Sequence, residues 1–453
     1  MGHARRVDPH ARRPLPARDR RLSRPRRADD ARRRALAQPV PRGAARVSRL
    51  EAPRGTHDIL PAEQPKWQRV TAEMERLCAL YGYRRIQTPG FEDTDLFART
   101  SGAGSDVVQK EMYTFQDRGG RSLTLRPEGT APICRAYVEH GLHREPQPVK
   151  LFTIAPMYRY GRPQRGRYRE HWQLSVEAIG SDDPALDAEI VQLYDELLRR
   201  LGATGYRLEL NSIGDRECRP AYLERLNAWL DEHEHELDAE ARQKRATTPL
   251  RVFDVKNPHV QAALADAPKI GESLCDACRE HFDAVRRYLD AYGVRYELEP
   301  TLVRGLDYYT RTAFEFVDEA IGAQSSICGG GRYDYVVEEI GGPPTPGIGF
   351  GAGIERLLLS LDLDAPQPQV DVFVDPDEEA DRARVLALMA ELRRRGLSCE
   401  TDYAGRSAKG RLTHGERLGA RVTLFAGPET VTVRRAGEAD RALRYEEIVD
   451  ALA

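Results

Sequence analysis

Two strand-like segments joined by an arginine-rich loop constrain the fold of this chain more than any other feature. The first covers residues 149–154, and the second, residues 171–179, alternates Gln173 and Glu177 with apolar residues. Successive side chains of a strand point to opposite faces of a sheet, so Gln173 and Glu177 share one face. Because polar groups on an inward face need partners, we expect these two side chains to face a partner or a ligand.

The rest of the chain mixes strand-like and helical patterns. A strand through Tyr83, Ile86 and Thr88 is expected to end before Pro89, and further strands are expected at 122–126, 206–211, 312–317 and 326–328. Helical periodicity covers 62–81, 129–140, 184–201 and 353–361. This order predicts an α+β fold built on a largely antiparallel sheet.

A chain of 453 residues is too long for one hydrophobic core, so we expect more than one domain. The first domain is expected to cover 51–361, interrupted by a charged and mostly helical insertion at 215–298. A proline-containing linker at 362–369 follows. Strand and helix patterns then alternate over 370–453, which predicts a small α/β domain.

The N-terminal residues 1–50 have a different composition, with 16 Arg against 4 Asp and few large apolar side chains. Such a segment cannot bury enough surface to offset its ordering entropy, so we expect it to be disordered. A nucleic-acid-binding tail, a transit peptide and a misplaced start, with Val47 as the alternative start, remain open. No apolar run approaches about 18 residues, which argues against a membrane span.

The chain has seven cysteines, an odd number, scattered from Cys78 to Cys399. This distribution indicates reduced thiols rather than a disulfide framework and favours a cytoplasmic location.

The loop inside "PMYRYGRPQRGRYREHWQLSVE", residues 156–177, concentrates positive charge. Five arginines fall within eleven residues, namely Arg159, Arg162, Arg165, Arg167 and Arg169. Guanidinium groups bind phosphates through paired donors, whereas a solvated basic loop is the alternative. The polar residues on the returning strand favour phosphate binding.

Two further segments carry candidate ligand groups. In "TLRPEGTAPICRAY", residues 124–137, Glu128 can neutralise an ammonium group, and Thr130 either caps the following helix or binds the same ligand, with capping favoured on its own. The stretch "TPGIGFGAGIERLLL", residues 345–359, has glycine at every second position before a helix that carries Arg356. These glycines either leave a bare sheet face for a flat ligand or form tight turns.

The motifs "RGLDYYTRT" at 304–312, "RPEGT" at 126–130 and "GGGRYD" at 329–334 complete a recognisable set. Over about residues 50–453 the chain resembles the bacterial-type histidyl-tRNA synthetases, which are class II aminoacyl-tRNA synthetases. Motif 1 of that class corresponds to the region ending at Pro89, motif 2 to 150–177 and motif 3 to 345–359.

The resemblance implies an enzyme that activates L-histidine with ATP and Mg2+ and transfers histidine to tRNA(His). It implies a homodimer joined through motif 1, with an antiparallel catalytic domain, a helical insertion and a C-terminal anticodon-binding domain at 370–453. No membrane partner is implied. A non-catalytic regulatory paralogue, acting with ATP phosphoribosyltransferase in histidine biosynthesis, is the competing hypothesis.

The same resemblance implies residue roles. Arg159 and Arg304 are the expected catalytic residues, on opposite sides of the ATP α-phosphate, and Arg356 holds the terminal phosphate side. Tyr309 and Glu177 are expected at the two imidazole nitrogens. The histidine backbone groups are expected to bind Glu128, Thr130, Gln173 and Tyr333. Tyr308 is a further candidate for histidine binding, although Tyr308 and Asp307 fit a structural role equally well.

Three features differ from the family pattern or are additional to it. Gly161 occupies a motif 2 position that is usually acidic and contributes to adenine recognition, so we expect adenine to depend more on backbone contacts. Residues 393–435 carry ten basic against four acidic side chains, which suits RNA phosphates, with a solvated face as the alternative. Cys275, Cys278 and His281 have ligand-like spacing, but zinc needs a fourth group, for which Cys218 is the candidate, and we expect no metal.

Overall fold

The computed structural model describes residues 49–452, apart from 103–104, 106, 323–324 and 365–368. The disorder expected for 1–50 concerns residues that lie outside this part, except 49 and 50. Half of the expected linker, 365–368, also lies outside it.

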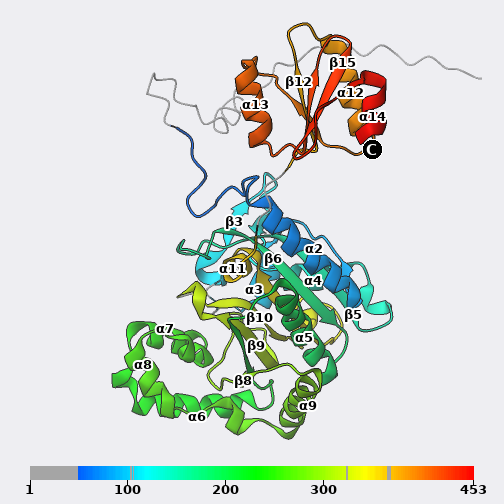
Figure 1. The fold of residues 1–453 in the computed structure, drawn as a ribbon. Coiled ribbons are helices and arrows are strands. Elements are labelled where there is room, and N and C mark those ends of the chain that lie inside the picture. The colour runs from blue at the N-terminus through cyan, green and yellow to red at the C-terminus, as the bar shows by residue number, and fades with distance from the viewer. Residues whose placement is uncertain (1–48, 103–104, 106, 323–324, 365–368, 453) are drawn as a thin grey trace, which may run out of the picture. The chain divides into compact units, whose positions relative to one another are not determined.

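An eight-stranded sheet forms the centre of the larger body (Figure 1). Its order is β1-β5-β6-β11-β10-β9-β7-β8, and only the two edge pairs, β1 with β5 and β7 with β8, are parallel. The largely antiparallel sheet expected from the sequence is therefore confirmed. The strands are β1 (Arg84–Arg85), β5 (Val149–Tyr158), β6 (Glu170–Ile179), β7 (Tyr206–Ser212), β8 (Glu297–Leu298), β9 (Thr310–Asp318), β10 (Ser326–Arg332) and β11 (Gly347–Gly353).

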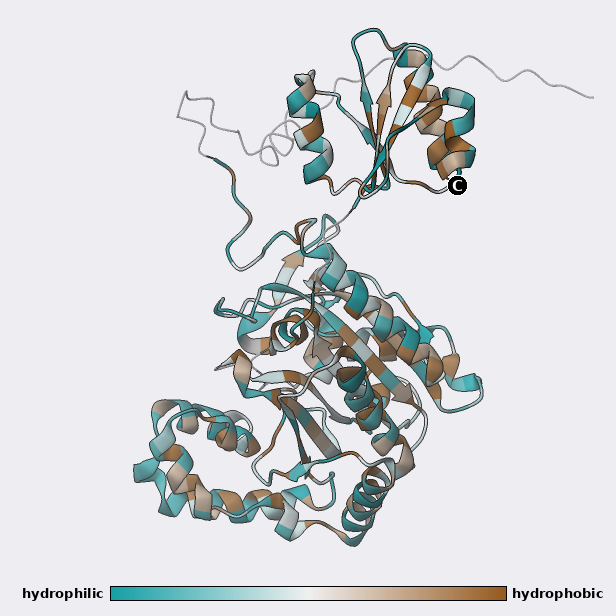
Figure 2. Cartoon of the chain, viewed as in Figure 1, coloured by the Kyte–Doolittle hydropathy of each residue, from teal (hydrophilic) through white to brown (hydrophobic). Residues whose placement is uncertain are grey.

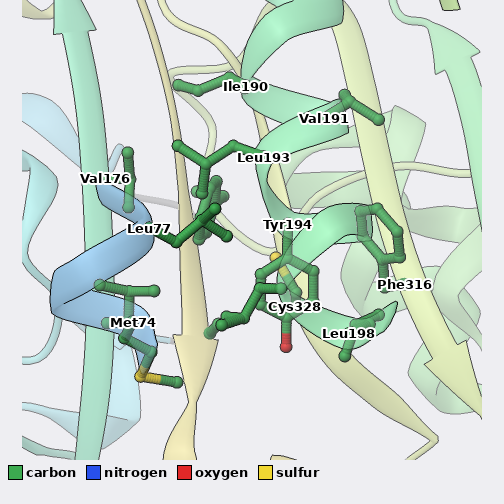
Figure 3. Close-up of a cluster of buried hydrophobic side chains, with 14 of the residues drawn as sticks. Met74, Leu77, Val176, Ile190, Val191, Leu193, Tyr194, Leu198, Phe316 and Cys328 are labelled. Atoms are coloured by element: carbon green, nitrogen blue, oxygen red, sulfur yellow. The ribbon is translucent and has the colours of Figure 1, made fainter. Parts of the chain in front are cut away.

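One face of this sheet is covered by four helices, α2 (Gln64–Leu80), α5 (Pro184–Leu201), α9 (Asp276–Tyr292) and α11 (Ile354–Ser360). Figure 3 shows Met74 and Leu77 of α2 meeting Val176 of β6 and the apolar side of α5. Apolar burial of this kind is the main favourable term in folding. Leu174 and Val176 of β6 are both completely buried here, as their alternation predicted.

The local signals at the ends of α5 explain why its bounds match the expected 184–201. Asp183 accepts a hydrogen bond from the Ala185 amide, which satisfies one free donor of the first turn, and Pro184 follows at a position that suits proline. Gly202 ends the helix with a φ of 80°, in the left-handed region that favours glycine.

The other face of the sheet carries α4 (Thr130–Glu139) and the short α10 (Val336–Glu339), with a second apolar cluster beneath them. Gln173, Ser175 and Glu177 of β6 point to this face, opposite Leu174 and Val176. The polar face expected for β6 is therefore confirmed, and it is the face on which the candidate site lies.

A small separate sheet holds the strand expected at 122–126. It has the order β2-β4-β3, with β2 (Phe91–Asp93), β3 (Tyr113–Gln116) and β4 (Ser122–Leu125), and α3 (Thr94–Thr100) follows β2. The strand expected from Tyr83 to Thr88 is reduced to the two residues of β1. Beyond β1 the carbonyls of Thr88 and Pro89 accept hydrogen bonds from buried Arg126 instead of a strand partner.

The range expected for the insertion, 215–298, divides between two apolar clusters. Helices α6 (Arg219–Glu232), α7 (Ala239–Thr247) and α8 (Pro258–Ala263) share an apolar cluster of their own. However, Val285 and Leu289 of α9 belong to the main cluster, and β8 pairs with β7. We therefore propose 215–278 as the insertion, because the chain rejoins the main core after Cys278.

A separate five-stranded sheet follows residue 370, with its own apolar cluster and the order β13-β12-β14-β15-β16. Figure 2 shows α13 largely in hydrophilic colours, whereas α12 and α14 carry more hydrophobic residues. The elements are β12 (Val372–Pro376), α12 (Arg382–Arg394), β13 (Cys399–Thr401), α13 (Ala408–Arg417), β14 (Val422–Ala426), β15 (Thr430–Arg435), β16 (Arg441–Arg444) and α14 (Tyr445–Leu452).

Candidate active site

A cavity of about 530 Å3 opens on the polar face of the eight-stranded sheet. Eight of the ten expected site residues line it, namely Glu128, Thr130, Arg159, Gln173, Arg304, Tyr308, Tyr309 and Arg356. Glu177 and Tyr333 do not line the cavity. Both are fully buried beside it, and they contact each other through the Tyr333 hydroxyl and Glu177 Oε2 at 2.6 Å.

The glycines of β10 and β11 make room for the site's own side chains rather than for a flat ligand. A Cβ atom at any of five glycines would overlap a site residue. The pairs are Gly329 with Arg304, Gly331 with Tyr309, Gly347 with Tyr333, Gly349 with Glu177, and Gly351 with Gln173. The expected bare face is therefore occupied at these positions. Only Gly353 of β11, beside Arg356, leaves ordinary van der Waals distance.

One end of the cavity is strongly basic. Arg159 is anchored by its Nε, which donates to the carbonyl of Pro127 at 2.7 Å, and Arg356 donates from Nε to the carbonyl of Gly166 and from Nη1 to that of Ser326, both at 2.8 Å. Backbone carbonyls thus orient both guanidinium groups. A fixed pair of guanidinium groups is suited to bind a phosphate.

Positive charges repel one another at this basic end of the cavity. Burial lowers the pKa of Arg356, and the nearby charges of Arg159 and Arg167 lower it further. Burial, with Arg159 and Arg356, also lowers the pKa of His171 to about 3, so this imidazole is neutral at pH 7. Three cations that repel one another around a neutral histidine would be stabilised by a bound polyanion.

The five arginines of the loop divide into groups. Arg159 and Arg167 line the cavity, Arg162 and Arg165 are exposed, and Arg169 stacks on the ring of Tyr160 at 3.8 Å. Of the five, Arg159 and Arg167 therefore stay candidates for phosphate binding. The others are solvated or packed.

Gly161 permits a close approach by Arg167. A Cβ atom at Gly161 would lie 2.9 Å from Arg167 Nε, and Arg167 Nη2 pairs with Glu111 Oε1 at 2.6 Å. Glu111 also lines the cavity, and its carbonyl accepts the Tyr160 amide at 2.7 Å. A carboxylate therefore lies beside the loop, supplied by residue 111 and not by position 161.

The guanidinium group of Arg304 lies against the backbone of Gly329 in β10. Its Nη1 pairs with Glu315 Oε2 at 3.2 Å, while its Nε is buried without a hydrogen-bond partner among the described residues. Burial acts to lower the pKa of Arg304, but attraction by Glu315 outweighs it and raises the pKa above the usual range. Arg304 therefore stays charged in the cavity wall and keeps an unused buried donor.

Glu128, and not Thr130, caps α4. Its two carboxylate oxygens accept the amides of Thr130 at 2.6 Å and Ala131 at 2.9 Å. The Thr130 hydroxyl instead donates to Glu177 Oε1 at 2.7 Å, so the capping role favoured for Thr130 was wrong. The longer Glu side chain reaches the same free donors from one residue before the N-cap Gly129.

Glu177 is held by two hydroxyls, those of Thr130 and Tyr333. Burial raises its pKa well above the ordinary value, and these two donors offset only part of that effect. A buried carboxylate of this kind attracts a cationic or hydrogen-bond-donating ligand.

The structure separates the two residues whose roles the sequence left open. Tyr308 lines the cavity, with its ring 4.5 Å from that of Tyr309. Asp307 does not line the cavity and accepts hydrogen bonds from the Thr248 hydroxyl at 3.3 Å. Asp307 thus connects the 302–309 segment to the insertion, which favours the structural alternative.

A buried ion-pair network that no sequence pattern predicted lies behind the site. Asp187 of α5 pairs with the fully buried Arg332 of β10 and with His281 of α9, whose Nε2 lies 2.8 Å from Asp187 Oδ2. His281 is therefore occupied and is not a ligand beside Cys275 and Cys278. Arg332 belongs to the "GGGRYD" motif, but no local signal connects it to Asp187, 145 positions away, or to His281, 51 positions away.

Comparisons with known proteins agree with this geometry. A sequence profile of the histidyl-tRNA synthetase family matches residues 55–357. The chain is 46% identical to the histidine–tRNA ligase of Halothermothrix orenii over 401 residues, covering 86% of this chain and 96% of that protein. It is 49% identical to the one from Moorella thermoacetica over 398 residues, with coverages of 84% and 93%.

Among solved structures, that of apo S. aureus histidyl-tRNA synthetase matches with a TM-score of 0.74 and 35% identity, covering 89% of this chain and 100% of the other. The class II catalytic fold expected from the sequence is confirmed by this match. With the profile match and the two ligases, it shows that the chain belongs to the histidyl-tRNA synthetase family.

Proposed function

We propose that this protein is a histidine–tRNA ligase, which forms histidyl-adenylate from ATP and L-histidine and then transfers histidine to tRNA(His). The observation that carries the proposal is the pairing, in one cavity, of a basic end with an end lined by carboxylate, hydroxyl and amide oxygens. A regulatory paralogue has no use for an oriented phosphate site, so the retained Arg159, Arg304 and Arg356 favour the enzyme.

The position of Arg159 supports its expected role at the ATP α-phosphate. Its anchor, the Pro127 carbonyl, directly precedes Glu128 in the chain. A phosphate bound by Arg159 would therefore lie next to an amino acid held by Glu128. This proximity is what in-line attack of the histidine carboxylate on the α-phosphorus requires.

Arg304 would act at the same phosphorus from the other side. As the carboxylate attacks, negative charge gathers on the phosphoryl oxygens, and preorganised donors stabilise this charge without a general base. The unused buried Nε–H of Arg304 is such a donor. Arg356 would hold the terminal phosphates, and Arg167 adds positive charge near them.

The histidine ammonium group would meet two oxygen acceptors. Glu128 offers a carboxylate, and Thr130 offers the lone pairs of a hydroxyl whose proton is already donated to Glu177. Gln173 donates from Nε2 to the Ser175 hydroxyl at 2.9 Å, which orients its side-chain amide in the cavity wall. A substrate without an ammonium group would leave these groups unpaired.

Tyr309 and Tyr308 are the proposed walls of the imidazole pocket. We revise the expected contacts of Glu177 with the imidazole and of Tyr333 with the histidine backbone. Neither residue lines the cavity, and the two are hydrogen-bonded to each other. Glu177 would position the Thr130 hydroxyl and stabilise positive charge on the imidazole from behind. Tyr333 would fix the orientation of Glu177.

Mg2+ would enter with the ATP phosphates. It prefers oxygen ligands and is commonly bound by one or two carboxylates together with substrate phosphates. Glu355 fits this requirement, because it lines the cavity and burial raises its pKa to about 7, a state that a nearby divalent cation would reverse. Glu315, beside Arg304, is the second candidate. The ion would neutralise the charge of the departing pyrophosphate.

The anticodon-binding role stays assigned to residues 370–453. Seven of the ten basic side chains at 393–435 pair with carboxylates, namely Arg394, Arg395, Arg406, Arg411, Arg421, Arg434 and Arg435. In the described part of the chain Lys409 and Arg417 form no ion pair, and both line a hollow of about 410 Å3 along α13. RNA phosphates would bind there, rather than across the whole basic excess.

We further propose a homodimer formed through α2 and the small sheet. Phe91 and Phe115 of that sheet are 50% and 43% exposed and contact each other edge to face, and Leu80 at the end of α2 is 62% exposed. Exposed apolar groups of this kind mark interfaces. Analytical ultracentrifugation at micromolar concentration should give the mass of a dimer, and a monomer would contradict the proposal.

No helix among the described residues has both the length and the apolar character needed to cross a membrane. The cytoplasmic location remains a prediction, which rests on the free state of all seven cysteines.

The experiment that tests the proposed function is histidine-dependent exchange of pyrophosphate into ATP. The enzyme should catalyse exchange with histidine and not with other amino acids. A regulatory subunit would show no exchange, and this result would refute the proposal. Arg162→Ala, at an exposed arginine of the same loop, is the matched control for Arg159→Ala, and only the latter should lose exchange.

A further inference from the structure

A buried cluster of metal-ligand groups lies outside the cavity, where the two ends of the insertion meet. Asp215, Cys218, Cys275 and Cys278 place one ligand atom each within 4.8 Å of one another. Three of the four residues are buried, and Cys275 is half-buried. The set differs from the one that the sequence suggested, because Asp215 takes the place of His281.

The distances within the cluster approach those of tetrahedral coordination. Cys218 and Cys278 have their Sγ atoms 3.9 Å apart, and Asp215 lies 3.5 Å from the first through Oδ1 and 3.0 Å from the second through Oδ2. A tetrahedral zinc site with Zn–S of about 2.3 Å and Zn–O of about 2.1 Å has S···S near 3.8 Å and S···O near 3.6 Å. Shifts of about 1 Å or less in the four ligand atoms would complete the geometry.

The sequence spacing also fits. The ligands come as two pairs, each separated by two residues, in "DREC" at 215–218 and "CDAC" at 275–278. Pairs with this spacing are typical of structural zinc sites. The Asp215 amide donates a hydrogen bond to Cys218 Sγ at 3.4 Å.

Positive charge surrounds the cluster. Arg311 Nη2 lies 3.7 Å from Asp215 Oδ2, and Arg219 follows Cys218 directly in the chain. Three thiolates and a carboxylate around Zn2+ carry a net charge of about −2, which two arginines would balance.

We propose that Asp215, Cys218, Cys275 and Cys278 bind one structural zinc ion, a site with four protein ligands and no open position. It would join the two ends of the insertion, closing a loop of 56 residues (219–274). This proposal does not depend on the assigned catalytic roles.

The zinc site would also support the histidine pocket. Arg219, at the start of α6, donates to the carbonyl of Tyr309 at 2.7 Å. The Arg311 amide donates to Gly214 at 2.7 Å, and Arg311 has a φ of 46°, which is uncommon for a residue other than glycine. A metal ion that holds Asp215 and Cys218 in place would therefore also hold the backbone that contacts Tyr309 and Arg311.

The test is the zinc content of the full chain, purified without a polyhistidine tag from cells supplied with zinc. Elemental analysis should find one zinc per chain. The Cys399→Ser variant, in which a buried cysteine far along the sequence is changed, should keep it, whereas Cys275→Ser should lose it. Replacing zinc by cobalt should give the absorption of tetrahedral thiolate-bound Co2+ in the parent protein only.

The measurement on the parent protein keeps the proposal falsifiable even if the cysteine variants fail to fold. A zinc-free parent protein with free thiols would overturn the proposal, as would a disulfide between Cys218 and Cys278 detected by mass spectrometry after alkylation. Asp215→Cys gives a second test, because it should retain zinc with a fourth thiolate. Loss of zinc in a folded Asp215→Cys protein would also count against the site.

Removal of zinc should have two consequences that differ from general inactivation. The melting temperature should fall, because a metal bound only by the folded chain stabilises it. The KM for histidine should rise more than the KM for ATP, because the site supports Tyr309. An equal change in both constants would contradict the link to the histidine pocket.

Discussion

Replacing Arg304 by alanine is the sharpest perturbation of the proposed chemistry. The buried Nε–H of Arg304 has no partner among the residues that the structure describes, so a transition-state oxygen is the acceptor that we expect for it. Removing one preorganised donor costs about 3 kcal/mol, or roughly a hundredfold in rate. The KM values for ATP and histidine should change far less, because the interaction forms in the transition state.

The ion pair with Glu315 gives the competing explanation. If Arg304 served only as the partner of Glu315, the alanine variant would be less stable but would form histidyl-adenylate at the normal rate at low temperature. The melting temperature should then fall clearly, because the two side chains are only 16% and 20% exposed and Glu315 would lose its partner in a largely buried position. Arg304→Lys should restore the charge and little of the rate, since an ammonium group lacks the planar paired donors.

Single-turnover formation of histidyl-adenylate, measured beside a thermal melt, separates these explanations. Arg162→Ala serves as the control, because Arg162 is exposed in the neighbouring loop. An unchanged chemical rate together with a lowered melting temperature would remove Arg304 from the catalytic residues.

Two further predictions concern His171 and the C-terminal domain. Because the pKa of His171 falls from 6.5 to about 3 on folding, the unfolded chain binds a proton that the folded chain does not, and stability declines as pH drops from about 6.5 towards 3. His171→Asn should remove up to about 1.4 kcal/mol per pH unit from this slope, measured by urea unfolding at pH 7 and pH 5, and identical slopes would disprove the assignment. The double variant Lys409→Glu, Arg417→Glu should raise the KM for tRNA(His) and leave pyrophosphate exchange unchanged, and normal charging of tRNA would move the RNA contact elsewhere.

Local signals predicted much of the fold. The bounds of α5 follow from Asp183, Pro184 and Gly202, and the polar face of β6 follows from simple alternation. Each of these features depends on residues within a few positions of one another. The motifs that carry the family resemblance are also contiguous, and eight of the ten residues taken from them line the cavity.

What the sequence could not predict depends on distant partners. Gly349 and Gly351 leave room for the side chains of Glu177 and Gln173, which come from another strand. No local sequence pattern distinguishes glycines of this kind from glycines that leave a sheet face bare for a ligand. His281 pairs with Asp187, which is 94 positions away, so its spacing to Cys278 was misleading. Asp215 joins the cysteine cluster because the segment after β7 lies beside the start of α9.

The most direct test of the central claim is the charging of tRNA(His) by the full chain with labelled histidine and ATP. We predict ATP-dependent attachment of histidine that requires both Arg159 and Arg304 and that fails with other amino acids and other tRNAs. If the folded chain formed no histidyl-tRNA under conditions in which a relative from the same family did so, the proposed function would be wrong.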